Sequence, residues 1–255
     1  MLELNYKTFG QGLPVVILHG LFGMLDNWQA VARKLSEDYT AYLPDLRNHG
    51  RSPHHDDMDY PCMAEDLRYF MESHWMFKAH IMGHSMGGKT AMQFALAHPG
   101  MVDKLIVVDI APKAYSGGHQ DIFDALMSAN LTGAAERSDV LTQLQSRIEA
   151  PGVQQFLMKN LSRNKKGKFE WKMNLPVLYK NYQNLLATID ADEPFEGPAL
   201  FIRGERSDYI LDEDWPMIKA VFPRAQLETI AGAGHWVHAD KPEELLEVLR
   251  AFLAG

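Results

Sequence analysis

Short apolar runs with many β-branched residues recur along the chain, and each is followed by a segment with helical periodicity. The runs predict strands at Val15–Leu18, Thr40–Leu43, Ala79–Met82, Lys104–Val108, Ala199–Arg203 and Gln226–Ile230. The periodic segments predict helices at Asn27–Ser36, Tyr60–Trp75, Met86–His98, Asp212–Val221 and Pro242–Leu253. This alternation predicts an α/β fold with a mostly parallel central sheet and helices on both faces.

Two parts of the chain depart from this alternation. Leu2–Phe9 alternates apolar and polar residues like a half-exposed strand, and we expect it at an antiparallel edge of the sheet. Residues 112–195 hold helical patterns without a convincing strand, and they are too many for a crossover. We therefore expect an α/β core of residues 1–111 and 196–255, with residues 112–195 as a helical lid inserted after the sixth strand.

Composition narrows the class of protein. The 255 residues are 46% hydrophobic and 23% charged, which is enough for a folded core. A net charge of -8 disfavours a nucleic-acid partner, since binding to phosphates needs a basic surface. The apolar runs are far shorter than a membrane span of roughly 18 residues. Because Met1–Gly10 also lacks the pattern of a secretion signal, we expect a cytoplasmic protein.

Ligands of parallel α/β sheets bind beyond the carboxyl ends of the strands, which directs attention to the residues after Ala79–Met82. The octet Gly83–Thr90 satisfies two motifs at once. One is the nucleophile elbow, G-x-S-x-G, with Ser85 at its centre. The other is the phosphate-binding loop, G-x-x-x-x-G-K-[ST], which ends in Lys89 and Thr90 and would bind a nucleotide.

Later residues favour the elbow. A serine nucleophile on such a fold needs an acid and then a histidine further along the chain. Asp109 ends the strand Lys104–Val108, Asp208 lies just past Ala199–Arg203, and His235 follows Gln226–Ile230. The glycine-rich turn after Val15–Leu18 is a candidate source of backbone N–H donors for a developing oxyanion.

With these residues in view, the chain resembles the α/β-hydrolase superfamily and, more narrowly, the YbfF-type esterases and their abhydrolase-domain-containing relatives. The similarity lies in HGLFGMLDNW from His19, DLRNHGRS from Asp45, GHSMGGKTAM from Gly83, DIAP from Asp109 and AGAGHWVHADKP from Ala231. It implies a serine esterase or thioesterase that cleaves acyl esters through an acyl-enzyme, without a cofactor or a metal. Ser85 would be the nucleophile and His235 the general base, and Leu21 and Met86 would supply the N–H groups of the oxyanion hole.

The acid of the triad stays open between two residues. Many α/β-hydrolases place it three residues after the glycine that closes the penultimate strand, and that position holds Ser207 here. Asp208 is one residue late, whereas Asp109 occupies a placement that some branches of the superfamily use. We favour Asp109 and keep Asp208 as the alternative.

The substrate is the least determined feature. Phe22 and Trp236 are candidates for the pocket wall. In the lid, residues 159–172 carry six basic side chains against one acidic side chain, and Lys165, Lys166 and Lys168 would meet the phosphates of an acyl-CoA if this run lies at the site mouth. The alternatives are a C–C bond hydrolase or perhydrolase on the same triad and, more remotely, a nucleotide hydrolase that uses Gly83–Thr90.

Overall fold

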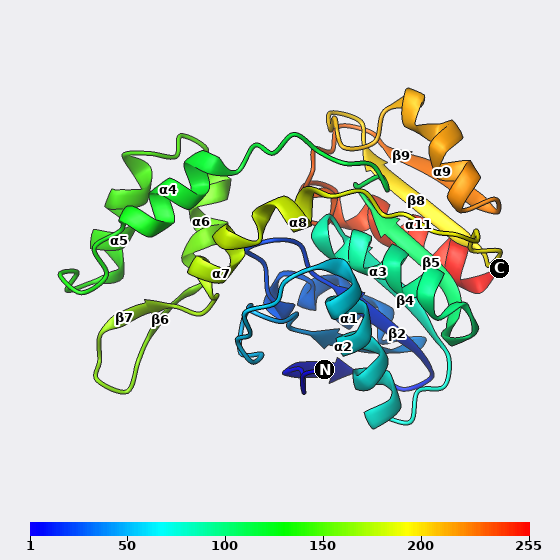
Figure 1. Cartoon of the computed structure of the whole chain (residues 1–255), viewed down its shortest axis with the longest axis horizontal. Coiled ribbons are helices and arrows are strands. Elements are labelled where there is room, and N and C mark those ends of the chain that lie inside the picture. The colour runs from blue at the N-terminus through cyan, green and yellow to red at the C-terminus, as the bar shows by residue number, and fades with distance from the viewer.

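A seven-stranded sheet runs through the centre of the protein in the computed structural model, which describes residues 1–255 (Figure 1). Its strand order is β1-β3-β2-β4-β5-β8-β9, and all neighbours are parallel except β1 and β3 at one edge. The strands are β1 (Tyr6–Phe9), β2 (Leu13–Leu18), β3 (Tyr39–Pro44), β4 (Ala79–His84), β5 (Val102–Val108), β8 (Ala199–Gly204) and β9 (Ala225–Ile230). The predicted α/β class and the antiparallel edge are confirmed.

The edge strand is shorter than its alternating pattern predicts. It begins at Tyr6, because the backbone N–H groups before it bind side chains instead of β3. The N–H of Leu2 donates to Asp66 Oδ1 at 2.8 Å, and that of Asn5 donates to Ser52 Oγ at 2.9 Å.

Helices cover both faces of the sheet, as the sequence predicts. The apolar side chains of β2 alternate between the faces: Val15 and Ile17 pack in one cluster with α1 (Gln29–Leu35) and α11 (Pro242–Ala254). Val16 and Leu18 pack in a second cluster. That cluster includes residues of α2 (Tyr60–Ser73), α3 (Met86–Ala97) and α9 (Trp215–Val221).

Short helical turns complete the core at the ends of these elements. They are η1 (Leu25–Asn27), η2 (Pro99–Met101), η3 (Asp212–Asp214) and α10 (Val237–Asp240). The first of them replaces the start of the predicted helix Asn27–Ser36, because the Asn27 side chain accepts a hydrogen bond from the N–H of Met24 at 2.7 Å. None of the helices combines the length and the apolar character that crossing a membrane requires.

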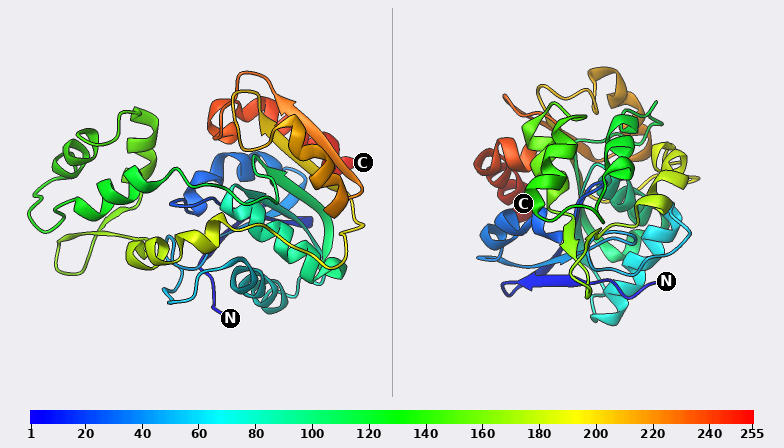
Figure 2. Two further views of the ribbon diagram at one scale, coloured as in Figure 1. Left: turned by 45° about the horizontal axis from the view of Figure 1, so that its top comes forward. Right: turned by 90° about the vertical axis from the view of Figure 1, so that its left-hand side faces the viewer.

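The segment between β5 and β8 forms a separate layer at one end of the sheet, and we call it the lid (Figures 1 and 2). Its elements are α4 (Gln120–Ser128), α5 (Arg137–Gln145), α6 (Pro151–Met158), β6 (Leu161–Arg163), β7 (Phe169–Trp171), α7 (Leu175–Lys180) and α8 (Tyr182–Leu186).

Two expectations about the lid are wrong. It follows the fifth strand and not the sixth: the five strands predicted before residue 112 correspond to β1–β5, and no further strand forms ahead of the lid. It also contains an antiparallel hairpin, β6–β7, where no strand was expected. Each of these strands has three residues, which is too short to display an alternating pattern.

The lid leaves and rejoins the core at one place, which we call the hinge. Pro112 O accepts hydrogen bonds from Thr188 Oγ1 at 2.8 Å and from the N–H of Ile189 at 2.7 Å. The N–H of Tyr115 donates to Leu186 O at 2.9 Å. The segment that enters the lid and the segment that leaves it, which we call the two chain crossings, therefore bond to each other at the hinge.

A buried ion pair holds the loop after β3 against α2. Arg47 Nε donates to Asp66 Oδ2 at 2.7 Å, and both side chains are almost fully buried. The other guanidinium nitrogens donate to Asp57 O and Cys62 O. The same loop carries His49, which contacts the loop after β2. By holding this loop, the ion pair between Arg47 and Asp66 supports the site described below.

We predict that Arg47→Gln lowers the free energy of unfolding by about 3–5 kcal/mol, because it leaves the Asp66 carboxylate buried without its cation. Arg68→Gln, on the helix that carries Asp66, is the matched control. Its exposed pairs with Glu65 and Glu72 are worth less than about 1 kcal/mol. Urea denaturation of the two variants measures both values, and equal losses would contradict the importance given to the buried pair.

Candidate active site

Ser85 lies in a tight turn between β4 and α3, with φ 53° and ψ −119°. Its N–H donates to Val108 O at 3.0 Å, which ties the turn to β5. A side chain at position 83 would place its Cβ 2.0 Å from Gly87 O, and one at position 87 would lie 2.5 Å from His19 O. The two glycines of the G-x-S-x-G motif are therefore packing requirements, and they bring Ser85 to the end of the sheet.

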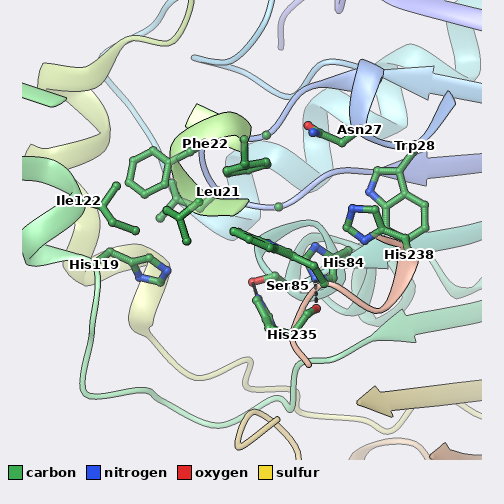
Figure 3. A pocket seen from close by; sticks show the side chains of 15 residues that line it. Leu21, Phe22, Asn27, Trp28, His84, Ser85, His119, Ile122, His235 and His238 are labelled. Carbon is green, nitrogen blue, oxygen red and sulfur yellow. Dashed lines mark hydrogen bonds between the residues drawn. The ribbon is translucent and has the colours of Figure 1, made fainter. Parts of the chain in front are cut away.

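Ser85, His235 and Asp109 form a continuous chain of hydrogen bonds. His235 Nε2 is 3.1 Å from Ser85 Oγ, and His235 Nδ1 is 2.7 Å from Asp109 Oδ2. His235 comes from the loop between β9 and α10, and Figure 3 shows it beside Ser85. Asp109 directly follows β5 and is fully buried. The structure thus brings together the three residues that the sequence ordered along the chain.

The Asp109 carboxylate is held by three donors. Oδ1 accepts from the N–H of Gly204 at 2.9 Å, and Oδ2 accepts from the Ser207 hydroxyl as well as from His235. Asp208 is exposed and makes no hydrogen bond to His235. The geometry therefore selects Asp109 as the partner of His235. Ser207, at the position where many relatives carry the acid, contacts the same carboxylate.

Aromatic rings confine the imidazole of His235. Tyr209 stacks on it with a centroid distance of 3.9 Å and an interplanar angle of 19°. His84 Nε2 is 2.8 Å from His235 O, and since a carbonyl only accepts, Nε2 carries the proton. The pKa of His84 lies well below its usual value because the ring is buried and faces His235. Burial likewise lowers the pKa of His119 and of His238 to about 4. These three neighbours of His235 are therefore neutral at pH 7.

Two further buried histidines shape the loop after β2. His19 Nδ1 donates to Gly20 O at 2.9 Å, and Nε2 accepts from the N–H of Leu46 at 3.0 Å. His49 Nε2 accepts from the N–H of Phe22 at 3.3 Å. Burial lowers the pKa of His19 to about 4 and that of His49 to about 3, so both rings are neutral and each can accept at one nitrogen. Their role is to hold the backbone of this loop.

The backbone N–H groups of Leu21 and Met86 are suited to an oxyanion hole. The N–H of Leu21 has no hydrogen-bond partner in the protein, and Met86 is the first residue of α3, where N–H groups have no partner within the helix. Both residues border the same cavity as Ser85.

Two cavities meet at Ser85, and each has a distinct wall. The first we call the aromatic cavity; Figure 3 shows it between lid residues and the core. The second we call the lysine cavity. Ser85, Leu21 and His119 border both of them. The other residues of the aromatic cavity include Phe22, Trp28, His84, Phe156, His235 and Trp236. Those of the lysine cavity include Tyr60, Met86, Lys89, Tyr115, Tyr182 and Tyr209.

The remaining predicted site residues divide into two groups. Phe22 and Trp236 border the aromatic cavity, as expected of pocket residues. Lys165, Lys166 and Lys168 are exposed in the turn of the β6–β7 hairpin, and they border neither cavity. No group of three or more His, Cys, Asp or Glu side chains is placed to hold a metal ion.

Several residues at the site carry little signal in the sequence. Tyr209 lies in a loop and Asn160 follows a helix, and no periodicity of the sequence distinguishes either residue. Asn160 is fully buried in the lid, and its Nδ2 donates to Phe22 O at 2.7 Å. Lys89 was visible in the octet, but as part of the phosphate-loop pattern. Ser207 has a positional signal, because it stands where many α/β-hydrolases carry the acid.

The fold and the chain of serine, histidine and aspartate define a hydrolase of the α/β class. The family model described as alpha/beta hydrolase fold matches residues 14–242, and the chain belongs to this family. It is 38% identical to the esterase YbfF of Escherichia coli, over 94% of this chain and 92% of that one. It is 39% identical to the sn-1-specific diacylglycerol lipase ABHD11 of Xenopus tropicalis, over 99% of this chain and 82% of that one.

A solved structure described as a marine microorganism esterase is 46% identical and superimposes with a TM-score of 0.97, covering 99% of this chain and 100% of that one. The predicted family and the predicted class, a hydrolase of carboxylic esters, are therefore confirmed.

We predict that Asn160→Ala lowers kcat/KM for an ester about tenfold, mainly through kcat, because Phe22 O loses its donor and the neighbouring N–H of Leu21 is less firmly held. Asn164→Ala is the control, since Asn164 serves only the exposed hairpin turn. Steady-state kinetics and thermal unfolding of both variants separate a positioning effect from a loss of stability. A rise in KM with kcat unchanged would contradict this prediction.

Proposed function

We propose that the protein is a serine esterase in which Ser85 is the nucleophile, His235 the general base and acid, and Asp109 the acid of the triad. The observation that carries this proposal is the hydrogen-bond chain from Ser85 Oγ through both nitrogens of His235 to Asp109 Oδ2. A nucleophile within hydrogen-bond reach of a base that is itself oriented by a carboxylate is the arrangement of serine hydrolases.

In the proposed reaction, His235 Nε2 takes the proton of Ser85 as Oγ attacks the carbonyl carbon of the ester. The N–H groups of Leu21 and Met86 bind the oxyanion that forms. His235 then gives the proton to the leaving oxygen, and the C–O bond to the alcohol breaks. Water, activated by the same imidazole, releases the acid from Ser85 and regenerates the enzyme. Asp109 stays ionised and stabilises the imidazolium.

The two cavities suggest where each half of the substrate lies. The leaving oxygen must approach His235 Nε2, because it receives its proton there. His235 borders the aromatic cavity and not the lysine cavity. We therefore assign the alcohol to the aromatic cavity and the acyl chain to the lysine cavity, with the scissile bond over Ser85.

The substrates proposed are acyl esters of small alcohols or glycerol. The relatives named above are an esterase and a diacylglycerol lipase, and both act on oxygen esters by name. Thioesters such as acyl-CoA remain a second candidate, for which the basic hairpin is the supporting feature. Its lysines would have to reach the phosphates from outside both cavities.

The first test is hydrolysis of p-nitrophenyl esters and acyl-CoAs of increasing chain length, with labelling by a fluorophosphonate. We predict turnover of the oxygen esters and labelling at Ser85, and a loss of at least about 10⁴-fold in kcat for Ser85→Ala. Replacement of Lys165, Lys166 and Lys168 by serine tests the acyl-CoA candidate, which requires a higher KM and a weaker salt dependence. Absence of any turnover by the wild type would overturn the proposed function.

The identity of the acid gives a second prediction. Asp109→Asn is expected to lower kcat about 10⁴-fold, because His235 loses the acceptor that fixes its tautomer. Asp208→Asn, a change of the same size at an exposed neighbouring position, is expected to stay within a few-fold of the wild type. Kinetics on one ester measure both. A large loss confined to Asp208→Asn would make Asp208 the acid.

A further inference from the structure

Lys89 is a buried cation that the proposed reaction does not use. It lies on α3, four residues after Ser85, and it is 1% exposed. Its Nζ donates to Lys113 O at 2.7 Å and also to Ala187 O. These carbonyls belong to the two chain crossings of the hinge. The rings of Tyr115 and Tyr60 lie 4.8 Å and 5.6 Å from Nζ.

No carboxylate forms an ion pair with this ammonium group. Burial alone lowers the pKa of Lys89 to about 8, with no acidic neighbour raising it. An ammonium has three N–H donors, and only two of them have partners among the protein atoms. Because a buried charge without a counter-ion is costly, such a group binds an anion or another acceptor favourably when one enters.

The lysine cavity is where that acceptor would lie. Lys89 borders it together with Ser85, and much of the remaining wall is apolar, with Ile110, Leu185 and Leu186 among the residues. The nearest titratable groups are neutral at pH 7. Burial raises the pKa of the four tyrosines of this wall, Tyr60, Tyr115, Tyr182 and Tyr209. The pKa of His119 is lowered to about 4.

Three carboxylates lie near this wall, and none forms an ion pair with Lys89. Asp109 is bonded to His235, Ser207 and the N–H of Gly204. Asp208 borders the cavity but is exposed, so water and salt screen it. Asp214 pairs with Lys113 at 2.6 Å, on the far side of the hinge. Lys89 is therefore the one buried charge on the wall of the cavity assigned to the acyl chain.

We propose that Lys89 binds a carboxylate at the far end of the acyl chain, so that the enzyme favours half-esters of dicarboxylic acids over esters of simple fatty acids. The proposal rests on the serine esterase function given above. The carboxylate would accept the third N–H of Lys89 while the ester carbonyl lies at Ser85. The acyl-enzyme would then hold the same contact until water releases the diacid.

The test compares ethyl half-esters of succinic, glutaric and adipic acid with ethyl esters of monocarboxylic acids of equal chain length, followed by titration of the released acid. The readout is the ratio of kcat/KM for the half-ester to that for its neutral counterpart. In Lys89→Met this ratio is expected to fall about ten- to a hundredfold, the usual worth of a hydrogen bond to a charged group. Lys113→Met removes a neighbouring hinge lysine that borders neither cavity, and it is expected to keep the wild-type ratio.

Lys89 also bonds to carbonyls of the hinge, so kcat/KM for the half-ester and for the neutral ester are both expected to fall in Lys89→Met. Only their ratio reports on recognition of the carboxylate. An unchanged ratio would show that Lys89 serves the hinge alone and would overturn the proposal. Failure of the wild type on both the half-esters and the neutral esters would instead contradict the esterase function itself.

The wild type supplies a measurement that needs no variant. Lys89 loses its charge as the pH rises through its pKa of about 8, whereas the carboxylate of the half-ester stays ionised. The ratio of kcat/KM values is therefore expected to be highest below pH 7 and to fall between pH 7 and 9. A ratio that stays constant over this range would contradict carboxylate binding by Lys89.

Discussion

The geometry of the site depends on one steric constraint, the close approach of β4, α3 and the loop after β2. Gly83 and Gly87 allow it, since a Cβ at either position would overlap a carbonyl of the neighbouring segment. The left-handed backbone of Ser85 is the result, and it turns the serine toward His235 while its N–H remains bonded to β5. The same approach brings the N–H groups of Leu21 and Met86 to one cavity. The proposed nucleophile and the proposed oxyanion donors are thus positioned by a single turn.

The acid is positioned by a different part of the sheet. Asp109 and Gly204 end neighbouring parallel strands, β5 and β8, so the carboxylate meets a backbone N–H of the next strand as well as His235. The Ser207 hydroxyl, at the position where many α/β-hydrolases carry the acid, donates to Asp109 Oδ2. In this chain the serine therefore supports the carboxylate of Asp109.

Much of this arrangement is predictable from the sequence. The parallel sheet, the elbow at Ser85, His235 and the oxyanion loop follow from strand periodicity and from glycine and histidine at strand ends, which are local signals. The hairpin at Leu161–Arg163 and Phe169–Trp171 is too short to leave such a signal. The contacts of Asn160 with Phe22 and of Tyr209 with His235 depend on tertiary packing between segments that are distant in the chain. The choice between Asp109 and Asp208 depends on burial and on a hydrogen bond, neither of which spacing alone determines.

The lysine of the octet shows how one pattern can serve two chemistries. In a phosphate-binding loop, the lysine after the second glycine extends toward a nucleotide. In this chain the same position lies on the first turns of α3, one helical turn beyond the nucleophile, and its ammonium group is bonded to hinge carbonyls at the border of the cavity. The motif therefore places a lysine in the first turns of a helix that begins beside the site in either fold. What differs is the group that the lysine meets: here Ser85 stands at the start of the helix, and the proposed partner of Lys89 is a carboxylate of the substrate and not a phosphate.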